Sequence, residues 1–108
     1  MTAYAVAIVR ETQFGPEIRE YLQRIDATLA PFSGVYRIHG GPYVPLEGAW
    51  SADLIMIEFP SMQLARDWYE SAAYRAIRPL RTEHSVGEVF LVEGVAQDHK
   101  GVDILGSP

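Results

Sequence analysis

The sequence predicts an α+β domain of the ferredoxin-like type, in which an antiparallel sheet carries both helices on one face. Four strand-like runs and two helical segments follow one another in the order βαββαβ. With 108 residues, 48% of them apolar, the chain can bury one core and is too short for a second. Apolar residues on both sides of the strands leave the other sheet face uncovered, so we expect a homodimer packed sheet against sheet.

The first strand and the first helix differ in the period of their apolar residues. Residues 2–9 alternate small and large side chains, which indicates a strand with one closely packed face. Gly15-Pro16 then opens a helix, because proline is tolerated at the first helical position. One apolar stripe follows at helical spacing: Ile18, Tyr21, Leu22, Ile25 and Leu29. Pro31 ends this helix.

The second and third strands flank a loop rich in glycine and proline. In the second strand, residues 34–39, we expect Tyr36 and Ile38 on one face. The other face should carry Val35, Arg37 and His39. Residues 40–50 are too rich in glycine and proline for regular structure. The third strand, residues 53–59, directs alternate side chains to opposite faces, with Leu54, Met56 and Glu58 on one of them.

The second helical segment begins after Pro60-Ser61, where the serine is an N-cap. Its apolar stripe consists of Leu64, Ala65, Trp68 and Ala72. Ser71 caps a further turn that contains Tyr74 and Ile77. We expect Pro79 to end or kink this segment, so that the helix continues only briefly.

The last strand covers residues 86–92, and Gly94 closes the domain. We therefore expect residues 1–94 to form the ferredoxin-like domain and residues 95–108 to form a tail. The tail has no periodicity, but three of its residues are apolar: Val102, Ile104 and Leu105. These side chains are candidates for docking on the partner protomer.

Composition and motifs exclude several classes of function. A net charge of -5 argues against nucleic acid as a partner. The absence of cysteine excludes disulfides, thiolate metal sites and cysteine nucleophiles. No nucleophile elbow, phosphate-binding glycine loop or dinucleotide fingerprint is present, so we expect no cofactor. Without a basic leader or a long apolar run, we expect a cytoplasmic protein with no membrane partner.

Several short segments resemble the small bacterial family known as domain of unknown function 1330. They are residues 35–41, Leu46-Glu47-Gly48 with Trp50, residues 57–61, residues 68–71 with Tyr74, and residues 91–94. The resemblance covers residues 2–94. It implies a dimeric α/β barrel, in which two ferredoxin-like protomers pack sheet against sheet and each keeps a small pocket. The chain departs from the family pattern at His39 and Pro79, both near the expected pocket, and the family has no generally established activity.

Arg37, His39 and Glu58 are the candidates for chemistry, because we expect them to share the sheet face turned away from the helices. A carboxyl group buried on such a face has a raised pKa unless a cation compensates, which suits a general acid or base. His39 and Glu58 are therefore the candidate catalytic residues, with Arg37 beside them as a ligand-binding residue. The alternative is an ion-pair network that fixes the register of the dimer.

Candidate ligand-binding residues also come from the second helical segment and the long loop. Arg75, Arg78 and Arg81 recur every three residues beside Tyr74 and would suit a ligand with a carboxylate. The alternative is a solvated helix face. Trp50, Tyr69 and Tyr74 are candidates for lining an apolar pocket, whereas Trp68 lies in the helix stripe and should pack in the core.

A metal site is not expected. His39, His84 and Glu58 are the residue types of a two-histidine, one-carboxylate iron site, but their spacing matches no motif.

Two hypotheses for function follow. The first is a small cofactor-independent enzyme of the monooxygenase, isomerase or cyclase type, acting on a carbonyl or aromatic compound. It rests on analogy with the wider superfamily of dimeric α/β barrels, and His39 or Glu58 would transfer the proton. The second is a non-catalytic homodimer that binds a small ligand or a protein partner. The sequence does not decide between them.

Overall fold

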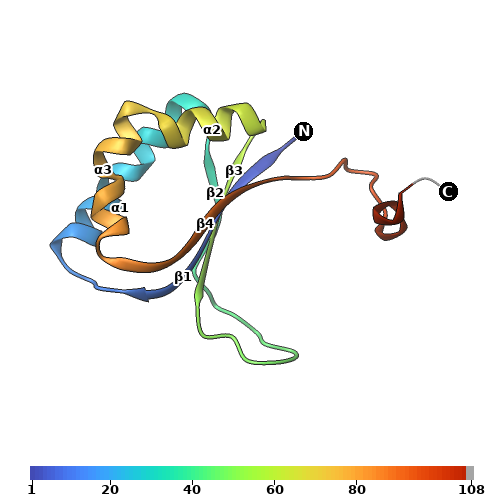
Figure 1. Cartoon of the computed structure of the whole chain (residues 1–108), viewed down its shortest axis with the longest axis horizontal. Helices are drawn as coiled ribbons and strands as arrows, with labels where there is room; N and C mark the ends of the chain where they lie inside the picture. The colour runs from blue at the N-terminus through green and yellow to red at the C-terminus, as the bar shows by residue number, and fades with distance from the viewer. Residues whose placement is uncertain (107–108) are drawn as a thin grey trace.

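The computed structural model describes residues 1–106 and confirms the ferredoxin-like α+β fold. One layer is an antiparallel sheet with the strand order β2-β3-β1-β4. Three helices form the second layer, on one side of that sheet (Figure 1). In chain order the elements are β1 (Ala3–Thr12), α1 (Pro16–Leu29), β2 (Val35–His39), β3 (Asp53–Phe59), α2 (Met62–Glu70), α3 (Ala72–Thr82) and β4 (Ser85–Glu93). Two short 3-10 turns cover Ala30–Phe32 and Gly101–Leu105.

The helices begin at the capping residues that the sequence indicates. Pro16 occupies the start of α1. The Ser61 hydroxyl accepts a hydrogen bond from the Leu64 N–H at 3.2 Å at the start of α2. The Ser71 hydroxyl accepts one from the Tyr74 N–H at 3.2 Å and donates one to the Trp68 carbonyl at 2.7 Å. Ser71 thus separates α2 from α3.

Pro79 does not end the second helical segment, so the expectation of only a brief helical continuation is wrong. Helix α3 runs from Ala72 to Thr82 with Pro79 inside it. A proline in a helix interior forgoes one backbone hydrogen bond. Tyr74 and Ile77 are almost completely buried in the core, and that burial outweighs the lost hydrogen bond. The break between the two helices lies at Ser71, the residue that the sequence indicates as a cap.

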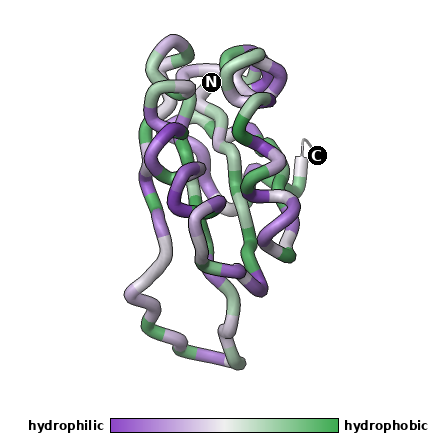
Figure 2. Tube along the Cα trace, turned by 90° about the vertical axis from the view of Figure 1, so that its left-hand side faces the viewer, coloured by the Kyte–Doolittle hydropathy of each residue, from purple (hydrophilic) through white to green (hydrophobic). Residues whose placement is uncertain are grey.

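The core lies between the helices and one face of the sheet. Trp68 is 2% exposed and contacts the rings of Phe59 and Tyr74, which confirms its predicted core position. Apolar residues recur along the strands and are interspersed with polar ones on the helices (Figure 2). At Gly34 a Cβ atom would lie 2.7 Å from the nearest atom of Leu29 and 2.8 Å from that of Phe59, so packing requires glycine there.

A β-bulge in β2 changes which side chains reach the core side of the sheet. Tyr36 pairs with Ile57 and Ile38 pairs with Met56, so Arg37 is the extra residue between them. Directly opposed residues share a face, and His39 pairs with Ile55 on the helix side. The expectation that His39 faces the same way as Arg37 and Glu58 is therefore wrong. The bulge shifts the alternation by one residue, which moves the following side chains to the other face.

We call the sheet side without helices the outer face. It carries exposed apolar side chains on both edge strands: Val35, Ile38, Phe90 and Val92. The chain after β4 runs out from the sheet on the side away from the helices (Figure 1). Its 3-10 turn exposes the three predicted apolar residues, with Ile104 84% exposed. Ser107 and Pro108, the end of the predicted tail, lie outside the described residues. Within residues 1–106, no helix has the length and apolar character needed to cross a bilayer.

Candidate functional site

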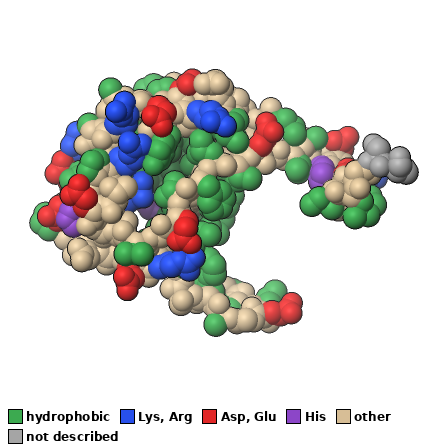
Figure 3. Space-filling view, viewed as in Figure 1, with side chains coloured by type: hydrophobic (Ala, Val, Ile, Leu, Met, Phe, Trp, Pro, Cys, Tyr) green, Lys and Arg blue, Asp and Glu red, His purple; other side chains and the backbone are tan. Residues whose placement is uncertain are grey.

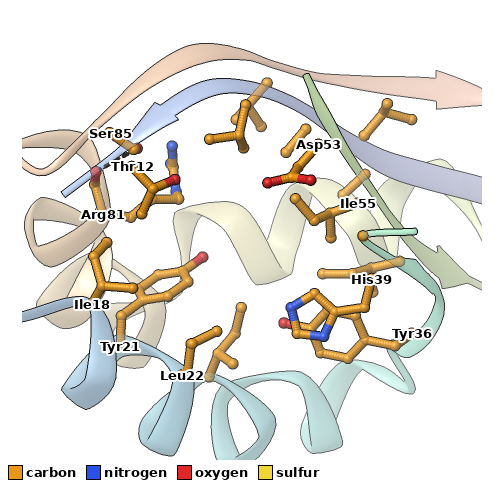
Figure 4. Close-up of a pocket in the computed structure, with 18 of the residues that line it drawn as sticks. Thr12, Ile18, Tyr21, Leu22, Tyr36, His39, Asp53, Ile55, Arg81 and Ser85 are labelled. Carbon is orange, nitrogen blue, oxygen red and sulfur yellow. Dashed lines mark hydrogen bonds between the residues drawn. The ribbon is translucent and has the colours of Figure 1, made fainter. Parts of the chain in front are cut away.

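A cavity of about 250 Å³ lies between the helix side of the sheet and helices α1 and α3 (Figure 4). Its apolar walls include Ala5, Ala7, Ile18, Leu22, Ile25, Ile55, Ile57 and Val89. The small side chains of β1 leave space at the sheet surface, where larger residues would fill it. Phe14, which is 81% exposed, belongs to the lining, and so does the exposed His39, so the cavity reaches solvent.

One end of the cavity is formed by a cluster of hydroxyl and guanidinium groups, Tyr21, Tyr74 and Arg81. The hydroxyls of Tyr21 and Tyr74 are 2.7 Å apart, and Arg81 Nε donates to the Tyr74 hydroxyl at 3.4 Å. Tyr74 and Arg81 are seven residues apart in α3, which places them on one helix face. Tyr21 reaches them from α1, across the contact between the two helices.

The protonation of this cluster follows from its burial. Burial raises the pKa of Tyr21 well above its ordinary value, and the neighbouring Tyr74 hydroxyl adds to this effect. For Arg81, burial lowers the pKa, but the hydroxyls of Tyr74 and Tyr21 outweigh it and leave the pKa above its ordinary value. The cluster therefore combines the protonated Tyr21 hydroxyl and the Tyr74 hydroxyl with the Arg81 cation, and it supplies hydrogen-bond donors to the cavity.

The other end of the cavity is formed by Tyr36, His39 and Asp53, which converge from β2 and β3 (Figure 4). The rings of Tyr36 and His39 are stacked, with centroids 4.5 Å apart and planes inclined by 18°. Burial raises the pKa of Tyr36 as well. An imidazole at the end of a largely apolar cavity can accept and return a proton.

The structure brings three of the predicted site residues to the cavity: His39, Tyr74 and Arg81. Sequence reasoning did not identify Tyr21, Tyr36 or Asp53 as site residues. Tyr21 belongs to the apolar stripe of α1, so its spacing predicts a core residue, and only its hydroxyl distinguishes it from the aliphatic members. Asp53 is the first residue of β3, and an acidic residue at the start of a strand does not by itself indicate a site.

Arg37 and Glu58 remain together, but on the outer face and not at the cavity. Arg37 Nε and Nη2 each lie 3.3 Å from a carboxylate oxygen of Glu58. The Arg37 side chain is 53% exposed and that of Glu58 is 32% exposed, so the pair is partly solvated. This arrangement fits the alternative of an ion pair on a partner surface.

The other predicted ligand-binding residues lie outside the cavity. Trp50 packs on Tyr43 within the loop between β2 and β3, with ring centroids 5.8 Å apart. The Arg78 guanidinium lies over the Tyr69 ring, 4.7 Å from its centroid. Of the three regularly spaced arginines, only Arg81 lines the cavity.

His84 does not join His39 and Glu58. Its Nδ1 atom lies 3.0 Å from the Leu80 carbonyl oxygen, and its Nε2 atom lies 3.7 Å from Glu17. Across the described part of the chain, no three histidine or carboxylate side chains gather in a group able to hold a metal ion.

Comparison with known proteins places the chain in a family and a fold. The family described as domain of unknown function (DUF1330) matches residues 2–95. No curated protein matches the chain. Among solved structures, a protein of unknown function from Rhodopseudomonas palustris is 14% identical with a TM-score of 0.62, covering 88% of this chain and 83% of its own.

Two further structures have the same fold. A dimeric ferredoxin-like protein of unknown function from Jannaschia sp. is 12% identical with a TM-score of 0.61, covering 87% of this chain and 100% of its own. SnoaB, a cofactor-independent oxygenase from Streptomyces nogalater, is 11% identical with a TM-score of 0.57, covering 92% and 97%. At these identities the likeness shows the fold alone.

Proposed function

Because the chain belongs to the DUF1330 family, we propose that it is a homodimer in which each protomer binds a small carbonyl or aromatic compound between sheet and helices. The observation that supports this most directly is the cavity with two polar ends. Donors of Tyr21, Tyr74 and Arg81 lie at one end, and His39 lies at the other. Apolar pockets with a few convergent polar groups are the usual form of small-molecule sites.

The proposed activity is proton transfer without a cofactor. The donor cluster holds a polar group of the ligand, and a nitrogen of His39 takes a proton from a ligand carbon next to a carbonyl group. The electron pair of the broken C–H bond delocalises onto the carbonyl oxygen of the ligand. Return of the proton to another ligand atom yields an isomer of unchanged composition. SnoaB, described as a cofactor-independent oxygenase, supports this only as an example of catalysis on the same fold.

Binding without catalysis is the second candidate function. The observation that favours it is that Glu58, the second predicted proton-transfer group, lies on the outer face and not at the cavity. His39 is then the single predicted base at the cavity, and most of the wall around it is apolar.

The proposed homodimer forms through the outer face. Exposed apolar side chains cover that face, and the Arg37–Glu58 ion pair lies among them. The tail and the loop between β2 and β3 both extend beyond the sheet and bracket a hollow with apolar side chains (Figure 3). A second copy would fill this hollow, cover the apolar face and bring the tail against the partner protomer. The dimeric neighbour from Jannaschia sp. supports this assembly.

Isotope exchange tests the proposed activity. The protein is incubated in deuterium oxide with a series of aryl ketones and 1,3-dicarbonyl compounds, and exchange at the carbon next to the carbonyl is followed by NMR. Wild type should exceed the buffer rate, and His39→Gln should lose the excess while Glu58→Gln keeps it. Loss in Glu58→Gln alone would assign the proton transfer to Glu58. Binding without exchange would leave the non-catalytic function, and failure of every compound to bind would contradict the cavity as a site.

A further inference from the structure

Arg81 carries a charge without a counter-ion among residues 1–106. The ion pairs of the described chain involve Arg10, Arg24 and Arg37, but not Arg81. The Arg81 side chain is partly buried and lines the cavity, and its neighbours there are the hydroxyls of Tyr74, 3.4 Å from its Nε atom, and of Tyr21. Charged groups inside proteins are normally paired, because desolvation without a partner is unfavourable.

The cluster also has more donors than acceptors. The Arg81 guanidinium has five N–H hydrogens, and within the described residues the hydroxyls of Tyr74 and Tyr21 are its acceptors. The Tyr21 and Tyr74 hydroxyls share one hydrogen bond, which leaves one phenolic hydrogen whichever of them donates. No completely buried side-chain nitrogen or oxygen of residues 1–106 lacks a partner, so any Arg81 nitrogen without an acceptor is in contact with the cavity or solvent.

The charges of the cavity are separated. Among the described residues that line the cavity, Asp53 is the one carboxylate, and it lies at the His39 end. It forms no ion pair with Arg81 within the described chain. A bound anion is therefore attracted toward Arg81 and repelled from the Asp53 end.

We propose that the ligand of this cavity is a small carboxylic acid with an apolar body, bound by its carboxylate to Arg81 and the Tyr21–Tyr74 hydroxyls. The planar guanidinium matches a carboxylate in geometry and charge. The alanine and isoleucine side chains of the walls contact the apolar body. This proposal rests on the proposed function of the cavity and specifies the class of its ligand. The sequence suggests a carboxylate at three arginines, and the structure selects one of them.

Two probes of nearly equal shape test the charge requirement: 3-phenylpropionate and its neutral amide, 3-phenylpropanamide. Their dissociation constants are measured by NMR titration of the full-length protein at pH 7.5. Wild type should bind the acid at least about tenfold more tightly than the amide, the order expected of a charge-assisted hydrogen bond. Arg81→Gln should remove this preference, and Arg81→Lys should keep part of it. Arg24→Gln is the matched control, because Arg24 pairs with Glu20 on the surface of α1.

The outcomes separate the two proposals. Equal affinity of wild type for acid and amide would overturn the carboxylate assignment and leave the cavity as a site for neutral compounds. If Arg78→Gln or Arg24→Gln removed the preference for the acid as fully as Arg81→Gln, the carboxylate assignment would also be overturned. The preference would then come from the overall charge of the protein. If neither probe binds wild type, the carboxylate assignment fails, and the binding function of the cavity is then decided by the ketone and dicarbonyl compounds of the exchange experiment. Circular dichroism verifies that each variant is folded.

Discussion

The indole nitrogen of Trp68 donates a hydrogen bond to the Thr28 hydroxyl at 3.0 Å and so joins α2 to α1 inside the core. The Thr28 hydroxyl in turn donates to the Ile25 carbonyl at 2.7 Å. Both residues are buried, and their polar atoms satisfy one another. This hydrogen bond links the end of α1 to α2 beside the rings of Phe59 and Tyr74.

Trp68→Phe should destabilise the fold, because it removes this hydrogen bond and leaves a void beside Phe59 and Tyr74. We expect a loss of about 2 to 4 kcal/mol in the free energy of unfolding, measured by urea denaturation. Trp50→Phe is the matched control, since Trp50 lies in a loop and is 42% exposed, and it should cost less than about 0.5 kcal/mol. Equal losses in the two variants would contradict the core assignment.

Stability should fall at alkaline pH because of Tyr21. Burial raises the pKa of Tyr21 in the folded protein, whereas the hydroxyl ionises near pH 10 in the unfolded chain. Above that pH the unfolded state holds fewer protons than the folded state, so stability decreases as the pH rises. The expected slope is roughly 1.4 kcal/mol per pH unit for each such group, and Tyr36 adds a second.

Tyr21→Phe should reduce this alkaline slope, although loss of its hydrogen bond costs about 1 kcal/mol at pH 8. Urea unfolding at pH 8, 10 and 11 measures both effects. Tyr43→Phe provides the comparison, because Tyr43 lies in the loop between β2 and β3 and also loses a hydrogen bond, the one from the Leu54 N–H. Identical slopes in wild type and Tyr21→Phe would show that Tyr21 ionises alike in both states.

Gly87→Ala should destabilise the pairing of β1 and β4. A Cβ atom at Gly87 would collide with the Ile8 carbonyl oxygen and lie 2.9 Å from the Val9 Cα atom. Because these are backbone atoms, the strands would have to separate, and we expect a loss of about 2 to 4 kcal/mol in thermal or urea unfolding. Gly101→Ala should be nearly neutral, since no atom lies within 4 Å of the added Cβ. A neutral Gly87→Ala would refute the close strand contact.

Phe90→Asp should dissociate the proposed homodimer. Phe90 is 44% exposed on the outer face, and a carboxylate there would be buried without a partner in a sheet-to-sheet interface. Light scattering coupled to size exclusion should give a dimer for wild type and a monomer for the variant. Gln23→Glu, which adds the same charge on the exposed side of α1, should remain dimeric. A monomeric wild type at tens of micromolar would exclude the assembly.

Ile104→Asp tests the proposed role of the tail. If the exposed apolar turn packs on the partner, this change should weaken dimerisation by about tenfold or more, as expected for losing one buried aliphatic side chain. Sedimentation equilibrium over a dilution series measures the dissociation constant. Gln97→Asp adds the same charge to a polar position of the tail and should leave it unchanged. An unaffected Ile104→Asp would mean that the tail takes no part in assembly.

The sequence by itself determined the order of the elements, the capping serines and the core position of Trp68. These features depend on residues close together in the chain: alternation marks a strand, a stripe at helical spacing marks a helix, and Ser61 and Ser71 each cap the residues that follow. These short-range patterns favour the same strands and helices in any tertiary arrangement that buries the apolar side of each element.

Only the tertiary structure decided which residues meet at the cavity. The single extra residue at Arg37 moves His39 to the helix side, and no local pattern shows where a strand carries a bulge. Burial of Tyr74 and Ile77 stabilises α3, which continues beyond Pro79 despite the low helix propensity of proline. The Tyr21 and Tyr74 hydroxyls meet although 53 residues separate them. Each of these outcomes is set by the packing of segments that are distant in the chain. Local sequence patterns therefore cannot predict them.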